Sequence, residues 1–187
     1  MRVMKLLLLP ALTVLAFSSH LHAEGGAFSK SVFQSRVTAD ISRIKATRVE
    51  GGDWDDKQDR ISFKIKFENS DPNKGFEGLK YDLFIFGQSI VDRKAFKLLQ
   101  RTTGEFSLPP LKSFENQTTE VVSKWDDTNA IFGDKYKGWY LLVYGPNGEL
   151  VLEKSVSSFF SDPAGLPGLV EGKYYDKNLM PIKVNGR

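Results

Sequence analysis

The chain has 187 residues, a formal net charge of +3 and no cysteine. Its two histidines, His20 and His22, both lie near the start, so the chain beyond them has neither residue type. That part of the chain therefore cannot use a cysteine nucleophile, a Ser-His-Asp triad, a histidine base or a histidine-bearing zinc site.

The first residues have the pattern of a secretory signal peptide. Arg2 and Lys5 form a short basic region, Leu6 to Phe17 is apolar, and Ala23 places a small residue at a cleavage point before Glu24. The apolar run is shorter than the ~20 residues that span a bilayer. We therefore expect residues 1–23 to be removed, with no retained transmembrane helix; an uncleaved anchor is the alternative.

If residues 1–23 are removed, both the location of the protein and the kinds of partner it can attract can be predicted. The mature chain would be exported, to the periplasm, the outer surface or the extracellular space. It would also be nearly neutral, because Arg2 and Lys5 account for most of the net charge. A nearly neutral chain with interspersed charges has no bulk attraction to nucleic acid.

Alternation of apolar and polar residues predicts strands in most of the mature chain. In the clearest case, residues 60–68, one face is apolar and the other is polar; the apolar residues are Ile61, Phe63, Ile65 and Phe67. The segment from Leu79 to Phe86 becomes apolar on both faces, which predicts a central strand that is covered on both sides or edged by a partner. Residues 89–102 fit a helix or a strand, and their β-rich surroundings favour a strand.

The stretch from Val32 to Val49 changes its alternation part-way. Val37, Ala39 and Ile41 share one face, but the next apolar residues, Ile44 and Ala46, belong to the other. Such a change in parity requires an extra residue in the strand. We therefore predict a β-bulge, or a switch between sheets, near residues 42–43.

The strongest local signal is a hairpin over residues 136–160. Two β-prone runs, residues 139–144 and 149–156, flank Gly145-Pro146-Asn147-Gly148. Asn-Gly between such runs favours a tight turn because both residues tolerate a positive φ.

Together these segments predict an all-β protein, an immunoglobulin-like antiparallel β-sandwich of about seven strands. We expect the sandwich domain to span residues 24–160. Residues 161–187 read as a Pro/Gly-rich linker and a C-terminal tail. In the tail, residues 178–184 could add a strand to the protein's own sheet or to a neighbour's edge; a self-docked or frayed terminus is the alternative.

Two loops combine tryptophan with aspartate. The first holds Asp53, Trp54, Asp55, Asp56 and Asp59, and the second holds Trp125, Asp126 and Asp127. Closely spaced carboxylates can bind calcium, Trp54 and Trp125 could contact a sugar ring, and a carboxylate pair could serve a glycosidase. The spacing does not match an EF-hand, so solvated loops whose tryptophans pack over the rim of the sandwich are the alternative. We expect no catalytic residue and no cofactor.

The second half of the chain resembles the back half of secreted immunoglobulin-like modules in bacterial surface proteins. The resemblance is carried by residues 108–111 (LPPL), 118–124 (TTEVVSK), 137–144 (KGWYLLVY) and 147–150 (NGEL). In layout, the mature chain is similar to single-domain immunoglobulin-like secreted proteins of gut Verrucomicrobia, some of which are encoded beside type IV pilus components and are described as pilin-like. The chain departs from type IV pilins, since it lacks their long apolar N-terminal helix, and from antibody domains, since it lacks their cysteines.

This resemblance implies a pilus-associated or surface protein and not a pilus shaft subunit. We therefore expect a non-enzymatic, secreted or surface protein with a role in adhesion or assembly. Its partners would be proteins or surface glycans. The alternative is a carbohydrate-binding module that uses Trp54 and Trp125.

Overall fold

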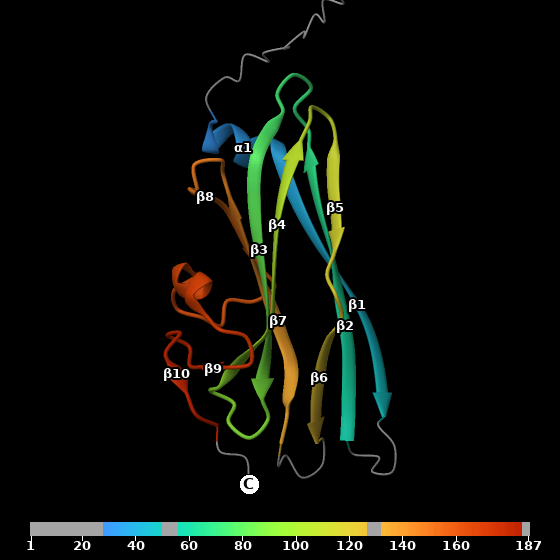
Figure 1. Ribbon diagram of the computed structural model, residues 1–187, viewed down its shortest axis with the longest axis vertical. Coiled ribbons are helices and arrows are strands. Elements are labelled where there is room, and N and C mark those ends of the chain that lie inside the picture. The colour runs from blue at the N-terminus through green and yellow to red at the C-terminus, as the bar shows by residue number, and fades with distance from the viewer. Residues whose placement is uncertain (1–27, 50–55, 127–131, 185–187) are drawn as a thin grey trace, which may run out of the picture.

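In the computed structural model, residues 28–49, 56–126 and 132–184 are described. They form two antiparallel sheets (Figure 1), which confirms the all-β sandwich. The signal peptide expected over residues 1–23 lies outside the described residues. Within them, no helix has the length and apolarity needed to cross a membrane.

The first sheet is built on one long strand. β2 (Asp56–Asn69) pairs along its whole length with β1 (Val37–Val49) on one side. On its other side β2 pairs with two shorter strands, β5 (Ser113–Gln117) and β6 (Val121–Asp126).

The second sheet has six strands in the order β10-β9-β4-β3-β7-β8. Its four longer strands are β3 (Phe76–Ser89), β4 (Phe96–Leu108), β7 (Asp134–Tyr144) and β8 (Leu150–Ser155). Two short strands, β9 (Tyr174–Tyr175) and β10 (Pro181–Ile182), extend it beyond β4. The described residues thus form ten strands, three more than the approximate count from sequence.

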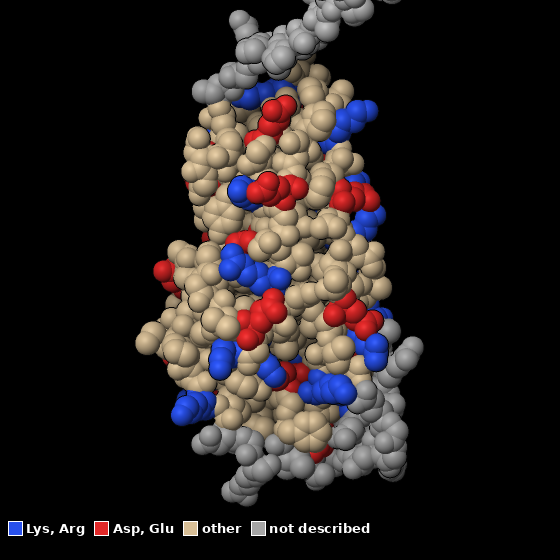
Figure 2. All heavy atoms as spheres, viewed as in Figure 1, with Lys and Arg blue, Asp and Glu red and all other residues tan. Residues whose placement is uncertain are grey.

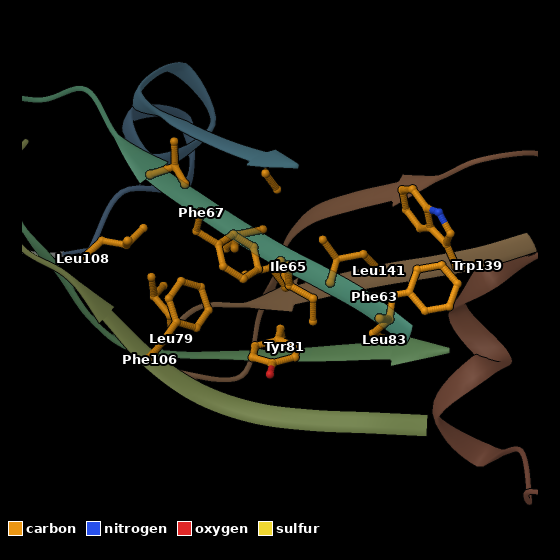
Figure 3. Close-up of a cluster of buried hydrophobic side chains, with 14 of the residues drawn as sticks. Phe63, Ile65, Phe67, Leu79, Tyr81, Leu83, Phe106, Leu108, Trp139 and Leu141 are labelled. Carbon is orange, nitrogen blue, oxygen red and sulfur yellow. The ribbon is translucent and has the colours of Figure 1, made fainter. Parts of the chain in front are cut away.

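The main core lies between the two sheets. The alternating residues of β2 are fully buried there and face side chains such as Leu83 and Leu141 of the second sheet (Figure 3). Phe67 stacks on Phe106 with ring centroids 4.3 Å apart. The short helix α1 (Lys30–Arg36) closes one end of this core with the buried Phe33.

A second core covers the outer face of the second sheet. Strands β3, β4 and β7 contribute Phe84, Phe86, Phe96, Leu98, Tyr140 and Leu142. The C-terminal segment covers them with Phe160, Leu166 and Tyr175, all buried. The two-sided apolar pattern of residues 79–86 is explained by this arrangement.

The C-terminal segment is therefore folded onto the sandwich as far as residue 184. Its Pro/Gly-rich part, expected as a linker, contains the 3-10 helix η1 (Pro163–Gly168), whose first turn is capped by Asp162. The tail then pairs with the chain's own sheet, because Tyr174 and Tyr175 lie opposite Lys97 and Phe96.

The predicted bulge in the first strand is wrong. β1 pairs with β2 in one unbroken register from Val37 to Val49. The parity of apolar residues changes because Arg43 and Lys45 follow Ile41 on the inner side of β1; both stay exposed, and they contact Tyr136 and Asp59. Ile44, on the other side of the strand, is 51% exposed. Long basic side chains that find partners can thus replace apolar ones on the inner face.

The predicted hairpin is formed by β7 and β8. The Gly148 N–H donates to the Gly145 carbonyl (3.0 Å), and the Gly145 N–H donates to the Glu149 carbonyl (2.9 Å). Only Gly148 of the turn has a positive φ (81°), and the pairing shifts register beside it, between Val143 and Tyr144. The connection is therefore a turn with one left-handed glycine and a bulge.

Candidate functional site

The described ends of the two aspartate- and tryptophan-bearing stretches lie side by side at one end of the first sheet. β2 begins at Asp56 and β6 ends at Asp126, and these two residues are direct partners in the sheet register. Asp53, Trp54, Asp55 and Asp127, and the side chain of Asp56, lie outside the described residues. The fold thus brings Asp56 and Asp126 opposite each other, although nothing in the sequence spacing predicts this.

The described members of this set are buried in the sandwich. Trp125 is 4% exposed, and the Lys135 ammonium lies 5.4 Å from its ring centroid. Asp59, also buried, forms an ion pair with Lys45 (Nζ–Oδ2 2.8 Å). A sugar could stack on Trp125 only after that ring was uncovered, and calcium at Asp59 would compete with Lys45.

Asp126 is buried as well. Within the described part of the chain, no group of three metal-binding side chains comes together. Calcium and sugar binding at these loops therefore stay predictions.

A buried carboxylate that the sequence analysis missed lies near the same end. Asp134, 5% exposed, begins β7 and accepts hydrogen bonds at Oδ2 from the Lys97 ammonium (3.0 Å) and the Tyr174 hydroxyl (3.1 Å). Its Oδ1 is buried without a hydrogen-bond partner. Because Tyr174 belongs to β9, this cluster ties the C-terminal segment to the sandwich.

The environment of this cluster changes the acidity of the tyrosine. Burial, together with the negative charge of Asp134 and its hydrogen bond, raises the pKa of the Tyr174 hydroxyl. The phenol thus stays protonated and donates to the carboxylate, which is a stabilising role and not that of a base. In the sequence, residues 125–135 read as a loop, and nothing there signals a buried ion pair at Asp134.

The outer edge of β1, which is the edge of the first sheet, is blocked by a side chain along only part of its length. The Lys154 ammonium donates to the Ala39 carbonyl of β1 (2.5 Å), and the Gln34 amide donates to the Val151 carbonyl of β8 (2.9 Å). In a strand, the N–H and C=O groups of every second residue point to the same side. Those of Ile41 and Arg43 therefore point away from β2, as the Ala39 carbonyl does.

No strand among the described residues pairs with this edge of β1. From Ile41 to Val49, the backbone donors and acceptors that point away from β2 therefore pair with no strand that the structure describes, along the margin of the molecule (Figure 1). We call residues 41–49 the open β1 edge. The face of the molecule shown in Figure 2 has no single sign of charge, because acidic and basic side chains are interspersed over it.

No protein-family model and no curated protein matches the sequence. Among solved structures, the chain is similar to a crystal structure from Akkermansia muciniphila, with a TM-score of 0.37 and 12% identity over 80% of this chain and 94% of that one. It is also similar to an X-ray structure of the Northeast Structural Genomics Consortium target SoR45, with a TM-score of 0.35 and 9% identity over 67% of this chain and 89% of that one. These TM-scores are too low to assign a family or a function.

Proposed function

We propose that the protein is an exported, non-enzymatic immunoglobulin-like protein that binds a protein partner in surface attachment or pilus-associated assembly. Export is supported by the signal-peptide pattern of residues 1–23. The surface or pilus context is supported by the resemblance of the sequence to secreted immunoglobulin-like proteins.

The single observation that carries the proposal is the open β1 edge. Unpaired strand edges are templates for an added strand, and soluble proteins normally block them. Here the blocking is uneven: Lys154 caps the Ala39 carbonyl, while no described strand pairs with the following half of β1, where the side chain of Ile44 is exposed. A partner strand beside residues 41–49 would continue the first sheet and cover Ile44.

Two exposed apolar side chains of the same sheet provide a matched comparison. Ile44 lies on the open β1 edge, and Val122 (41% exposed) lies on β6 at the opposite side of the sheet. A photo-crosslinking amino acid at each position, in cells that produce the protein, should give a discrete crosslink to another exported protein from position 44 only.

The same cells would provide the second arm of the test. Ile44→Lys should abolish the partner's co-purification, and Val122→Lys should leave it unchanged. Equal crosslinking from both positions, or none from position 44, would overturn the edge as the binding surface. Strong binding on a glycan array with no protein crosslink would favour the carbohydrate-binding alternative instead.

A further inference from the structure

An apolar groove lies in the C-terminal segment, between η1 and the β9–β10 hairpin. Its volume is ≈ 800 Å³, and its walls are formed mainly by Gly168, Leu169, Val170, Leu179, Pro181 and Ile182. We call it the C-terminal groove. Val170 (58% exposed) and Met180 (60% exposed) are two of the most exposed apolar side chains of the described chain, and both belong to the segment that forms it.

One wall of the groove is held in a strained conformation. Leu179 has a φ of 63°, a region that costs a residue other than glycine about 1–3 kcal/mol. The turn is maintained by Asp176, whose carbonyl accepts from the Leu179 N–H (3.1 Å) and whose Oδ1 accepts from the Met180 N–H (2.9 Å). Strain of this kind persists where surrounding contacts impose it, and here it fixes a leucine in the groove wall.

The charges of the groove all have one sign. Among its described lining residues, the charged ones are Lys173 and Lys183. Neither forms an ion pair with any residue that the structure describes. An apolar surface bordered by two unpaired ammonium groups complements a ligand that has an apolar chain and a negative head group.

We propose that the C-terminal groove binds a single-chain amphiphile with a carboxylate head group, of the fatty-acid type. Its volume falls within the roughly 300–1,000 Å³ of small-molecule sites. Its ten lining residues are fewer than the ~20–30 per partner in a stable protein interface, which favours a small ligand over a protein. The proposal rests on observations separate from the open β1 edge and stands or falls independently of it.

Calorimetric titration with octanoate, decanoate and dodecanoate, below their micelle concentrations, tests the apolar contacts. Affinity should rise about fourfold with each methylene that is buried. Gly168→Leu provides a variant that fills the groove, because a Cβ at this position meets nothing within 4 Å and the fold should be unaffected. It should weaken binding of every chain length.

Charge reversal tests the head group. Lys173→Glu with Lys183→Glu should weaken dodecanoate binding by about twofold to thirtyfold and leave dodecanol binding unchanged, since exposed ion pairs contribute about 0.2–1 kcal/mol each. The control, Lys112→Glu, reverses an exposed lysine outside the groove. An absence of saturable binding, an affinity independent of chain length, or equal losses in the double variant and the control would each overturn the proposal. So would unchanged binding by a correctly folded Gly168→Leu variant.

Discussion

Replacement of Leu166 by alanine tests whether the C-terminal segment is part of the folding unit. Leu166 is fully buried in the second core, although it comes from a stretch that reads as a linker in the sequence. Leucine-to-alanine changes at buried sites cost about 2–5 kcal/mol. Because η1 is short and borders the open C-terminal groove, it can partly collapse around the lost atoms, so we expect a loss near 3 kcal/mol, about the middle of that range.

For a chain of this size each kcal/mol lowers the melting temperature by about 2–4 °C, so the shift should be about 6–12 °C. Chemical denaturation of the chain from Glu24 onward, followed by tryptophan fluorescence, measures the free energy of unfolding. Val170→Ala is the matched control, since Val170 is 58% exposed and its truncation should cost less than about 0.5 kcal/mol. If Leu166→Ala cost no more than this control, the segment would unfold independently of the sandwich, and the reasoning would be refuted.

Three further predictions concern the interior. Asp134→Asn should destabilise the protein by about 1–3 kcal/mol in urea denaturation, because it leaves the partly buried Lys97 without its carboxylate; an unchanged midpoint would contradict the importance of the pair. Because the pKa of Tyr174 is raised above its unfolded value of about 10, its contribution to stability is complete below that pH and declines as the pH rises towards the folded pKa. Tyr174→Phe should therefore reduce the loss of stability measured between neutral pH and about pH 11, and an identical decline in both proteins would exclude this cause. Gly104→Ala should cost about 1–3 kcal/mol, because its Cβ would lie 2.5 Å from the Tyr81 ring, whereas Gly168→Ala, in open space, should be neutral; equal thermal shifts would disprove this account.

The strands and the hairpin could be predicted because their signals are local. Ile61, Phe63, Ile65 and Phe67 alternate without interruption, and the structure buries all four. The predicted bulge is wrong for the opposite reason: Arg43 and Lys45, on the inner side of β1, find partners in Tyr136 on β7 and Asp59 on β2. Alternation alone does not reveal such partners.

The candidate surfaces could be predicted less well. The sequence identified the two aspartate-bearing loops, but the burial of Trp125 depends on its place at the end of β6 beside β2. One feature of the sequence indicated that another segment packs on the second sheet: residues 79–86 are apolar on both faces, and the C-terminal segment covers the outer one. Asp134 had no such signal in the sequence, because its partners Lys97 and Tyr174 come from β4 and β9. The C-terminal groove had none either, because it forms where η1 and the β9–β10 hairpin fold beside each other.

The second core also has a consequence for folding during synthesis, because it joins residues that are far apart in the sequence. Phe84, Phe86 and Tyr140 belong to central strands, yet the residues that cover them include Leu166 and Tyr175, near the very end of the chain. Until Leu166 and Tyr175 have been synthesised, the apolar outer face of the second sheet stays uncovered. A chain cut short before Leu166 would therefore expose the apolar outer face of the second sheet and would be prone to association.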